Sequence, residues 1–250
     1  MKELKSVLKT EFGVCSFDLI KDRLLECRKK ADIPENAKSV IVFTFPYKVF
    51  EEKPENISRY AAVRDYHPVI ESFLKEYAEK LKEVYKENRF NVFVDNSPVP
   101  EVYCAAAAGL GVIGENGLLI TEKYGSFVFF GEIVTDLYIP CENKVNYCIN
   151  CGACRKACPV GLNKEKCLSA VTQKKKELNE EEISLIKNNG TVWGCDICAE
   201  ACPMNKEKEL THIKEFTDSY RNSYSPDEDP TNRPYIWRGK AVIERNIKFL

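Results

Sequence analysis

The strongest constraint on this chain is a run of four cysteines within eleven residues, CINCGACRKACPVG, which begins at Cys148. Its spacing, Cys-x2-Cys-x2-Cys-x3-Cys-Pro, is that of the bacterial ferredoxin motif, in which the fourth cysteine ligates a neighbouring cluster. Gly152 and Ala153 are small enough to let the loop curl tightly around a cubane. Disulfides and zinc are the alternatives, but a structural zinc site usually has two separated Cys-x2-Cys pairs. The run therefore predicts iron–sulfur ligation.

A second run repeats the last three positions of the first. Cys195, Cys198 and Cys202 are spaced x2 and x3, and Pro203 follows. Cys167 replaces the missing first cysteine, which brings the total to the eight thiolates that two 4Fe–4S clusters need.

The crossed pattern of two-cluster ferredoxins divides these eight cysteines into two sets. One cluster is assigned Cys148, Cys151, Cys154 and Cys202, and the other Cys158, Cys167, Cys195 and Cys198. Cys141 is the rival ligand, but the count is complete without it, so a free loop thiol is the preferred interpretation. Cys15, Cys27 and Cys104 are predicted to be small buried hydrophobic residues.

Composition places these thiols in a reducing compartment. The chain has 37 basic and 38 acidic residues and a net charge of −1, so no global basic field points to nucleic acid. The N-terminal sequence lacks a secretory signal, and the longest apolar runs are too short to span a bilayer. A cytoplasmic protein without a membrane segment is expected, and cytosolic cysteines are more often metal ligands than disulfides.

The remaining pattern predicts an α/β (α+β) body. Strands are expected from Ser39 and from Phe90, and a helix from Pro68 with apolar residues at three- and four-residue spacing. An alanine-rich helix from Glu101, ended by glycines, precedes two more apolar strands. The predicted domains are an α/β domain over 1–140, a ferredoxin-like module over 141–205, and a polar tail with a terminal helix over 206–250. Between the two cysteine runs, the charged segment from Lys174 is predicted to be a solvated surface helix.

Several motifs resemble one known family. ISRYAAVRDYH, FVDNSPVPE, AAGLGVIGENGLLIT, GSFVFFGEIVTD and WGCDICAEACPMN are similar, in order, to motifs of epoxyqueuosine reductases. The resemblance implies a nitroreductase-like α/β domain that carries cobalamin (a corrinoid), beside a two-cluster ferredoxin-like module. It implies an oxidoreductase that removes the epoxide oxygen of epoxyqueuosine in tRNA, with electrons passing from the clusters to cobalt.

The same resemblance implies roles for individual residues. Asp95 corresponds to the family's general acid, although a turn-forming role in DNSP is the alternative. His67 is expected to contact corrinoid or substrate, with a purely structural histidine as the alternative. Gly109, Gly111 and Gly114 are expected to let the backbone approach the corrinoid. Read as a dinucleotide fingerprint, GLGVIG is weak because no strand precedes it.

Departures from the family leave the substrate open. The chain stops at Leu250, where typical members continue into a helical-repeat domain that grips tRNA, and Asn96 and Ser97 replace the family's usual residues. The expected partners are a low-potential donor of the ferredoxin or flavodoxin type and tRNA, a smaller substrate or a corrinoid protein. The alternatives to an enzyme are a redox partner that reduces cobalamin for another protein and a plain two-cluster electron carrier.

Overall fold

The computed structural model describes residues 1–250, which form two compact units, each interrupted in sequence. The first unit comprises Met1–Phe45, His67–Glu122 and Val128–Ile149. The second comprises Pro46–Tyr66, Lys123–Phe127 and Asn150–Leu250. Two short segments from the middle of the predicted α/β domain thus belong with the cysteine-rich half of the chain.

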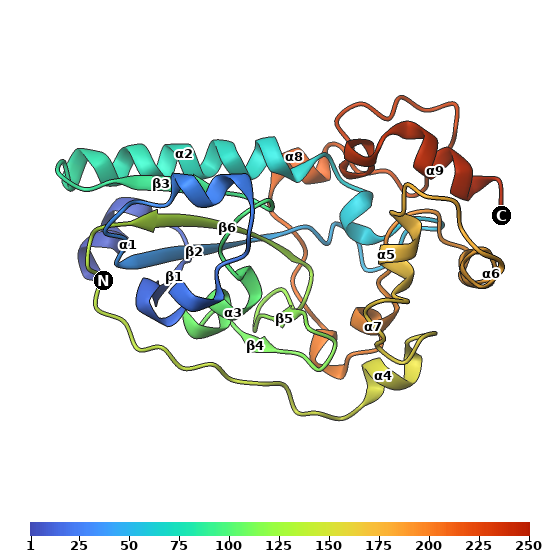
Figure 1. Ribbon diagram of the computed structural model, residues 1–250, viewed down its shortest axis with the longest axis horizontal. Coiled ribbons are helices and arrows are strands. Elements are labelled where there is room, and N and C mark those ends of the chain that lie inside the picture. The colour runs from blue at the N-terminus through green and yellow to red at the C-terminus, as the bar shows by residue number, and fades with distance from the viewer. The chain divides into compact units, whose positions relative to one another are not determined.

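A four-stranded sheet is the centre of the first unit (Figure 1). The strands lie in the order β1-β2-β6-β3, and β1 pairs antiparallel with β2 and β3 antiparallel with β6. The strand bounds are β1 (Gly13–Ser16), β2 (Ser39–Pro46), β3 (Phe90–Phe93) and β6 (Val128–Thr135), with a separate hairpin of β4 (Val112–Ile113) and β5 (Leu119–Ile120). The helices are α1 (Lys2–Leu8), α2 (Tyr66–Val84) and α3 (Glu101–Ala107).

Helix α2 packs directly on the sheet, alongside which it runs in Figure 1. A Cβ added at Gly131 of β6 would lie 2.8 Å from Ile70 and 2.9 Å from Leu74, so only glycine permits this approach. Phe43 of β2 stacks on Tyr77 with ring centroids 5.0 Å apart. The apolar spacing that predicts α2 therefore corresponds to its sheet-facing side.

The alanine-rich helix α3 belongs to a second buried layer. Its residues Cys104 to Ala107 are completely buried and form one cluster with Val40, Val42 and Phe93 of the sheet. Small side chains let the helix backbone lie close to the strands, which explains the run of alanines that ends this helix. Cys15 and Cys104 are buried as predicted, whereas Cys27 is only half-buried.

The second unit is built from short helices. Their bounds are α4 (Ala153–Ala157), α5 (Leu168–Thr172), α6 (Glu180–Asn189), α7 (Ile197–Glu200), α8 (Lys214–Thr217) and α9 (Lys240–Ile247). Ile57 forms a parallel bridge with Trp193, and the Ser58 N–H donates to the Trp193 carbonyl at 2.8 Å. These contacts explain why the segment from Pro46 belongs to this unit.

Two surface predictions for this unit need correction. The region from Lys206 to Pro234 is not a tail laid on the surface, because Phe216, Tyr224 and Arg233 in it are buried. The Arg233 guanidinium donates to the Ala62 carbonyl at 3.1 Å. Helix α6 begins at a capping box formed by Asn179 and Glu182, yet its Ile186 is completely buried, so one face of this charged helix is core.

Candidate functional site: a cysteine-rich unit and a carboxyl cluster

The chemistry-bearing side chains of the two units form separate groups. The second unit contains seven of the eight predicted cluster ligands, and none of the seven forms a disulfide. The first unit contains Asp95, His67 and two further acidic residues that the sequence did not single out.

The cysteines of the second unit lie at the ends and starts of short helices. Gly152, in the left-handed conformation with φ 73°, begins α4, which contains Cys154 and ends at Cys158. Cys167 caps the start of α5. Two further ligands flank α7 and one lies within it: Cys195, Cys198 and Cys202. Helices α4 and α7 pack against each other, which brings the two cysteine runs together.

Cys195 lies close to two other ligands assigned to the same cluster. The pKa of Cys195 is raised to about 12, first by burial and then by Asp196 and the neighbouring thiols of Cys198 and Cys167. A bound metal cluster would stabilise such a buried thiol as the thiolate. The donor set of the second unit thus fits cluster ligation.

Two further cysteines belong to the first unit: Cys148, which begins the first run, and Cys141, which precedes it. The Cys148 backbone N–H donates to the Ile113 carbonyl at 3.0 Å, and its place in the first cluster stays a prediction. Cys141 is half-buried, with its sulfur 3.6 Å from the Asn143 amide nitrogen. No group of three or more His, Cys, Asp and Glu side chains is gathered tightly enough to hold a single metal ion. A cubane is larger than one ion, and its thiolates stand farther apart.

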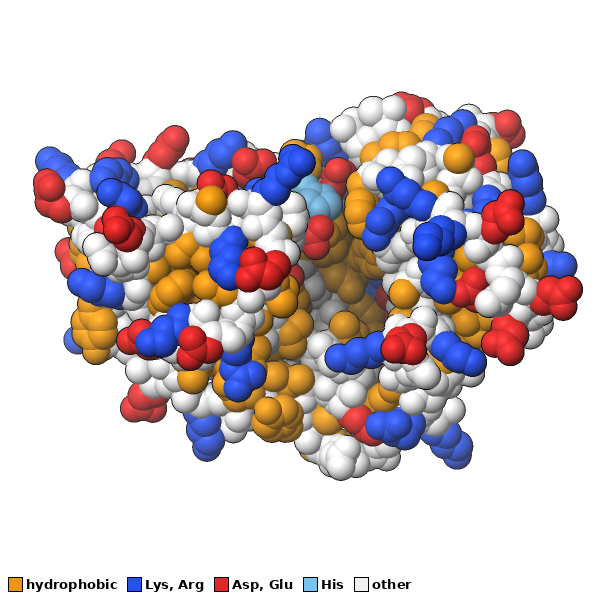
Figure 2. All heavy atoms as spheres, viewed as in Figure 1, with side chains coloured by type: hydrophobic (Ala, Val, Ile, Leu, Met, Phe, Trp, Pro, Cys, Tyr) orange, Lys and Arg blue, Asp and Glu red, His pale blue; other side chains and the backbone are white.

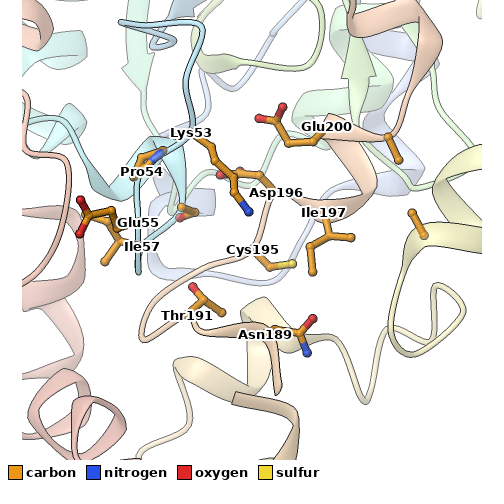
Figure 3. Close-up of a pocket in the computed structure, with 13 residues that line it drawn as sticks. Lys53, Pro54, Glu55, Ile57, Asn189, Thr191, Cys195, Asp196, Ile197 and Glu200 are labelled. Carbon is orange, nitrogen blue, oxygen red and sulfur yellow. The ribbon is translucent and has the colours of Figure 1, made fainter. Parts of the chain in front are cut away.

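A cavity of about 410 Å³ lies beside Cys195 in the second unit (Figure 3). Its lining includes Lys53, Asp196 and Glu200. Burial raises the pKa of Asp196 to about 6, although its carboxylate accepts the Arg59 backbone N–H at 2.6 Å. The buried Arg59 side chain pairs with Glu200 and donates to the carbonyls of Phe50 and Glu51, both at 2.7 Å. This network joins the Pro46–Tyr66 segment to α7.

In the first unit, Asp95 follows β3 and lies opposite His67. Its Oδ2 is 3.1 Å from His67 Nε2, and both side chains reach solvent, with 54% of Asp95 and 35% of His67 exposed. Asp95 has φ 51°, in the left-handed region that few residues other than glycine, asparagine and aspartate adopt. Its carbonyl accepts the Ser97 N–H, which closes a tight turn. Such strain in a non-glycine residue often marks a functional position.

Two glutamates lie behind this pair. Glu101 begins α3, and its pKa is raised to about 8, first by burial and then by the negative charge of Asp95. A hydrogen bond from the Asp95 backbone and the charge of His67 act in the opposite direction. The protonation of Glu101 therefore depends on the charges of its neighbours Asp95 and His67.

Glu132 of β6 is the most enclosed of these groups. It pairs in register with Phe93 of β3 and is completely buried. Neither of its oxygens has a hydrogen-bond partner of ordinary geometry, although the Ser97 hydroxyl lies near enough to favour the charged form. Burial, and next the charge of Glu101, raise the pKa of Glu132 well above its usual value.

The signal for Glu132 was present in the sequence. It is an acidic residue in the otherwise apolar strand VFFGEIVT, where a charge is costly unless it is neutralised or paired. Glu101 gave no such signal, because an acidic residue in the first turn of a helix is ordinary.

The three glycines predicted to face a corrinoid have different surroundings. Gly109 has φ 80° and open space where a Cβ would project. A Cβ at Gly111 would lie 2.5 Å from the Ile120 carbonyl oxygen, and one at Gly114 would lie 2.4 Å from Asn116 Oδ1. Packing against the β4–β5 hairpin is sufficient to require glycine at Gly111 and Gly114, so their role toward a cofactor stays a prediction.

The surface charges and the lengths of the helices bear on possible partners. Acidic and basic side chains are interspersed on the face shown in Figure 2, in keeping with the net charge of −1. None of the helices combines the length and hydrophobicity that crossing a membrane requires.

Two family profiles match the chain. Residues 29–96 match the profile described as epoxyqueuosine reductase QueG, DUF1730, and residues 147–205 match a 4Fe-4S double cluster binding domain. The second range contains all eight cysteines assigned to the clusters.

Relatives and solved structures agree with both profiles. The epoxyqueuosine reductase of Lactococcus garvieae is 34% identical over 252 residues, which cover 86% of this chain and 69% of that protein. That of Gloeobacter violaceus is 38% identical over 184 residues, covering 69% of this chain and 58% of that protein. The structure of the Streptococcus thermophilus enzyme matches with a TM-score of 0.82 and 25% identity, covering 99% of this chain and 80% of that one.

A mixed α/β fold with a double-cluster binding domain defines an iron–sulfur oxidoreductase. The chain belongs to the epoxyqueuosine reductase family, as the relationship to the Lactococcus garvieae protein shows. The resemblance expected from the sequence motifs is thereby confirmed.

Proposed function

We propose that this protein is a corrinoid-dependent reductase that removes the epoxide oxygen of epoxyqueuosine in tRNA. The observation that carries the proposal is the strained Asp95, 3.1 Å from His67, in a chain that belongs to the epoxyqueuosine reductase family. A family member has been solved with a tRNA-Tyr epoxyqueuosine-modified stem loop, and it matches this chain with a TM-score of 0.82.

The two clusters form the electron path of this proposal. Two 4Fe–4S clusters, ligated as the crossed pattern assigns them, form a ferredoxin-like module that accepts electrons from a low-potential ferredoxin or flavodoxin. Support comes from the cysteines in and beside α4, α5 and α7, none of which forms a disulfide, and from the thiols of Cys198 and Cys167 near Cys195, which raise its pKa.

When bound, a corrinoid would supply a strongly nucleophilic, redox-active metal centre, which is the chemistry that amino-acid side chains lack. On this proposal the first unit is the nitroreductase-like domain that holds it, with His67 and Gly109 as contacts. The half-buried imidazole of His67, which reaches solvent, and the open space at Gly109 fit such a role.

Asp95 acts as the general acid at the departing oxygen. Its carboxyl group reaches solvent, so a substrate can approach it, and His67 orients it from the other side. A Bacillus subtilis family member that matches with a TM-score of 0.81 was solved with its catalytic aspartate loop swung out of the active site. The loop after β3 here, which turns at Asp95, is the segment that we expect to move in this chain.

The deciding experiment combines cofactor loading with turnover. The anaerobically purified protein is expected to contain about eight irons, to change the spectrum of added cob(II)alamin, and to convert an epoxyqueuosine stem loop to the queuosine form. Cobalamin binding without turnover would instead favour a redox partner that reduces cobalamin for another protein. Iron without cobalamin binding would leave a two-cluster electron carrier.

A further inference from the structure

The two cysteine runs lie in stretches of opposite charge. From Asn150 to Lys166 the chain has four basic residues and one acidic residue, which gives a net charge of +3. From Cys195 to Glu209 it has two basic and four acidic residues, which gives a net charge of −2. Because the whole chain has a net charge of −1, the positive charge beside the first run is a local feature.

The positive residues lie on α4 and on the loop that follows it, and this loop connects two ligands of the same cluster. Cys158 ends α4 and Cys167 begins α5, and both are assigned to the cluster that also includes the ligands on α7. The loop between them therefore stays near that cluster. Lys156 precedes the loop and Lys164 lies within it, and both residues are exposed.

Hydrogen bonds fold the loop into successive turns. The Gly161 N–H donates to the Cys158 carbonyl at 3.0 Å. The Asn163 side chain accepts the N–H groups of Glu165 and Lys166 at 2.9 and 3.2 Å. A loop held in this way presents its side chains in a fixed arrangement, which lowers the entropy that is lost when a partner binds.

Neighbouring elements hold this loop, but two of its basic groups have no partner. The Arg155 guanidinium of α4 donates to the Gly161 carbonyl at 3.3 Å. The Lys166 ammonium lies 3.5 Å from a carboxylate oxygen of Glu181 on α6. Lys156 and Lys164, in contrast, form no ion pair or side-chain hydrogen bond. Two unpaired ammonium groups thus adjoin the cluster ligands.

We propose that Lys156 and Lys164 form the docking surface for the electron donor, and that the donor is an acidic carrier protein of the ferredoxin or flavodoxin type. The inference rests on the proposed function, because it takes the clusters as the entry point of electrons. On docking, the donor loses one electron and an oxidised cluster gains it, and no bond forms or breaks. The acceptor is the cluster with Cys158 and Cys167 among its ligands, since this surface adjoins both.

Charge complementarity is the physical basis of this docking. A basic surface attracts an acidic carrier over a distance that salt shortens, and it orients the acidic face of the carrier toward the cluster. Electron-transfer complexes are small and weak, so this attraction matters more for the rate than apolar burial does. RNA phosphates are the alternative polyanion. The position of both lysines beside cluster ligands favours the carrier, because electron transfer requires close approach to a cluster and phosphate binding does not.

The test measures how fast a reduced acidic flavodoxin passes electrons to the anaerobic, cluster-loaded protein. Lys156→Glu/Lys164→Glu should lower the second-order rate constant about 10- to 100-fold at low ionic strength, and added salt should shrink this difference. Lys2→Glu/Lys86→Glu makes the same change of charge at exposed positions of the first unit, and its rate constant should stay within about twofold of wild type. Stopped-flow absorbance of the flavin follows the transfer.

Two further measurements separate docking from damage to the protein. Dithionite needs no docking surface, so it should reduce the clusters of both double variants as fast as those of wild type, and each should contain about eight irons. Should the charge reversal disturb folding, Lys156→Gln/Lys164→Gln should show a smaller loss of rate in the same direction.

Equal rate constants in the two double variants would overturn the docking surface. A loss of stem-loop affinity in Lys156→Glu/Lys164→Glu with unchanged electron transfer would also overturn it, because the lysines would then bind RNA. The proposed function fails separately. Electron entry that depends on these lysines, without turnover of the stem loop, retains the docking surface and removes the reductase activity. Turnover with electron entry that does not depend on them has the opposite meaning.

Discussion

The two chemically active regions of this protein differ in how their residues are brought together. In the second unit, seven predicted ligands lie within 52 residues of sequence, from Cys151 to Cys202, on short helices whose spacing is set by the motif. In the first unit, the four residues come from separate elements. His67 lies on α2, Asp95 on the β3–α3 loop, Glu101 on α3 and Glu132 on β6. Local spacing determines the first kind of site, and tertiary packing determines the second.

The two regions should therefore be sensitive to different substitutions. A cluster-binding loop depends on its ligand atoms, because the cluster itself organises the loop. A buried carboxyl cluster depends on its surroundings, since burial and neighbouring charges set the protonation of each group. The predictions below test this contrast, from the largest expected effect to the smallest.

Replacing one assigned ligand should remove a cluster and abolish activity. Cys198→Ser should lower the iron content from about eight to about four per chain, and the electron path to the corrinoid should be lost. Iron analysis and dithionite-reduced absorption spectra measure the effect. Cys141→Ser is the matched control and should retain about eight irons. If Cys141→Ser instead lost iron, Cys141 would be a ligand and the assignment of eight cysteines would need revision.

Replacing the general acid should leave the clusters intact. Asp95→Asn keeps the size and polarity of the side chain but removes its acidity, so turnover should fall by about 10²- to 10⁴-fold. Iron content and cobalamin binding should match those of wild type. Full activity in Asp95→Asn would remove this residue from the chemistry and leave the turn-forming role as its explanation.

Much of this architecture follows from sequence patterns. Strand β2 begins at Ser39 and β3 at Phe90, as their apolar runs predict, and α2 covers the predicted helix from Pro68. The pattern was sufficient there because burial on one or both faces leaves a periodic signal. The eight cysteines were assigned by spacing and, for Cys167, by the count of ligands needed. All eight lie within the residues that match the double-cluster profile, and the role of each as a ligand stays a prediction.

The remaining features required tertiary contacts that no local pattern contains. The segment from Pro46 to Tyr66 belongs to the second unit because Ile57 and Ser58 pair with Trp193, more than a hundred residues away. Polar composition from Lys206 to Pro234 suggested an exposed tail, yet Phe216 and Tyr224 are core residues. Glu101 gave no signal in the sequence, and it belongs to the carboxyl cluster only because the fold brings it near the charge of Asp95, which raises its pKa.

The Arg59 network tests whether the second unit depends on packing as well as on ligands. Arg59→Met should destabilise the protein by about 3–5 kcal/mol, because it leaves Glu200 without its partner and three backbone carbonyls without the guanidinium donor. Urea unfolding of the cluster-loaded protein measures the loss. Lys80→Met, at an exposed ion pair on α2, is the control and should leave the free energy of unfolding nearly unchanged. Equal effects of both substitutions would mean that the clusters alone hold this unit together.

The smallest effect, a change in the pH dependence of stability, tests the carboxyl cluster. Burial raises the pKa of Glu132 and of Glu101 above the ordinary glutamate value of 4.5 in the folded protein, to about 8 for Glu101. Their contribution to stability is therefore fully present below about pH 4.5 and is lost as pH rises toward the folded pKa values. Glutamine at position 132 cannot ionise. Between pH 5 and pH 8 the free energy of unfolding of Glu132→Gln should therefore fall less than that of wild type, and the two losses should differ by about 1 kcal/mol or more. Urea unfolding at several pH values checks this, with Glu87→Gln, at an exposed position, as the control. If the free energy of unfolding of the variant fell as steeply with pH as that of wild type, burial would not control the protonation of Glu132. The carboxyl cluster would then not depend on its surroundings, which is the property that separates it from the cysteine region.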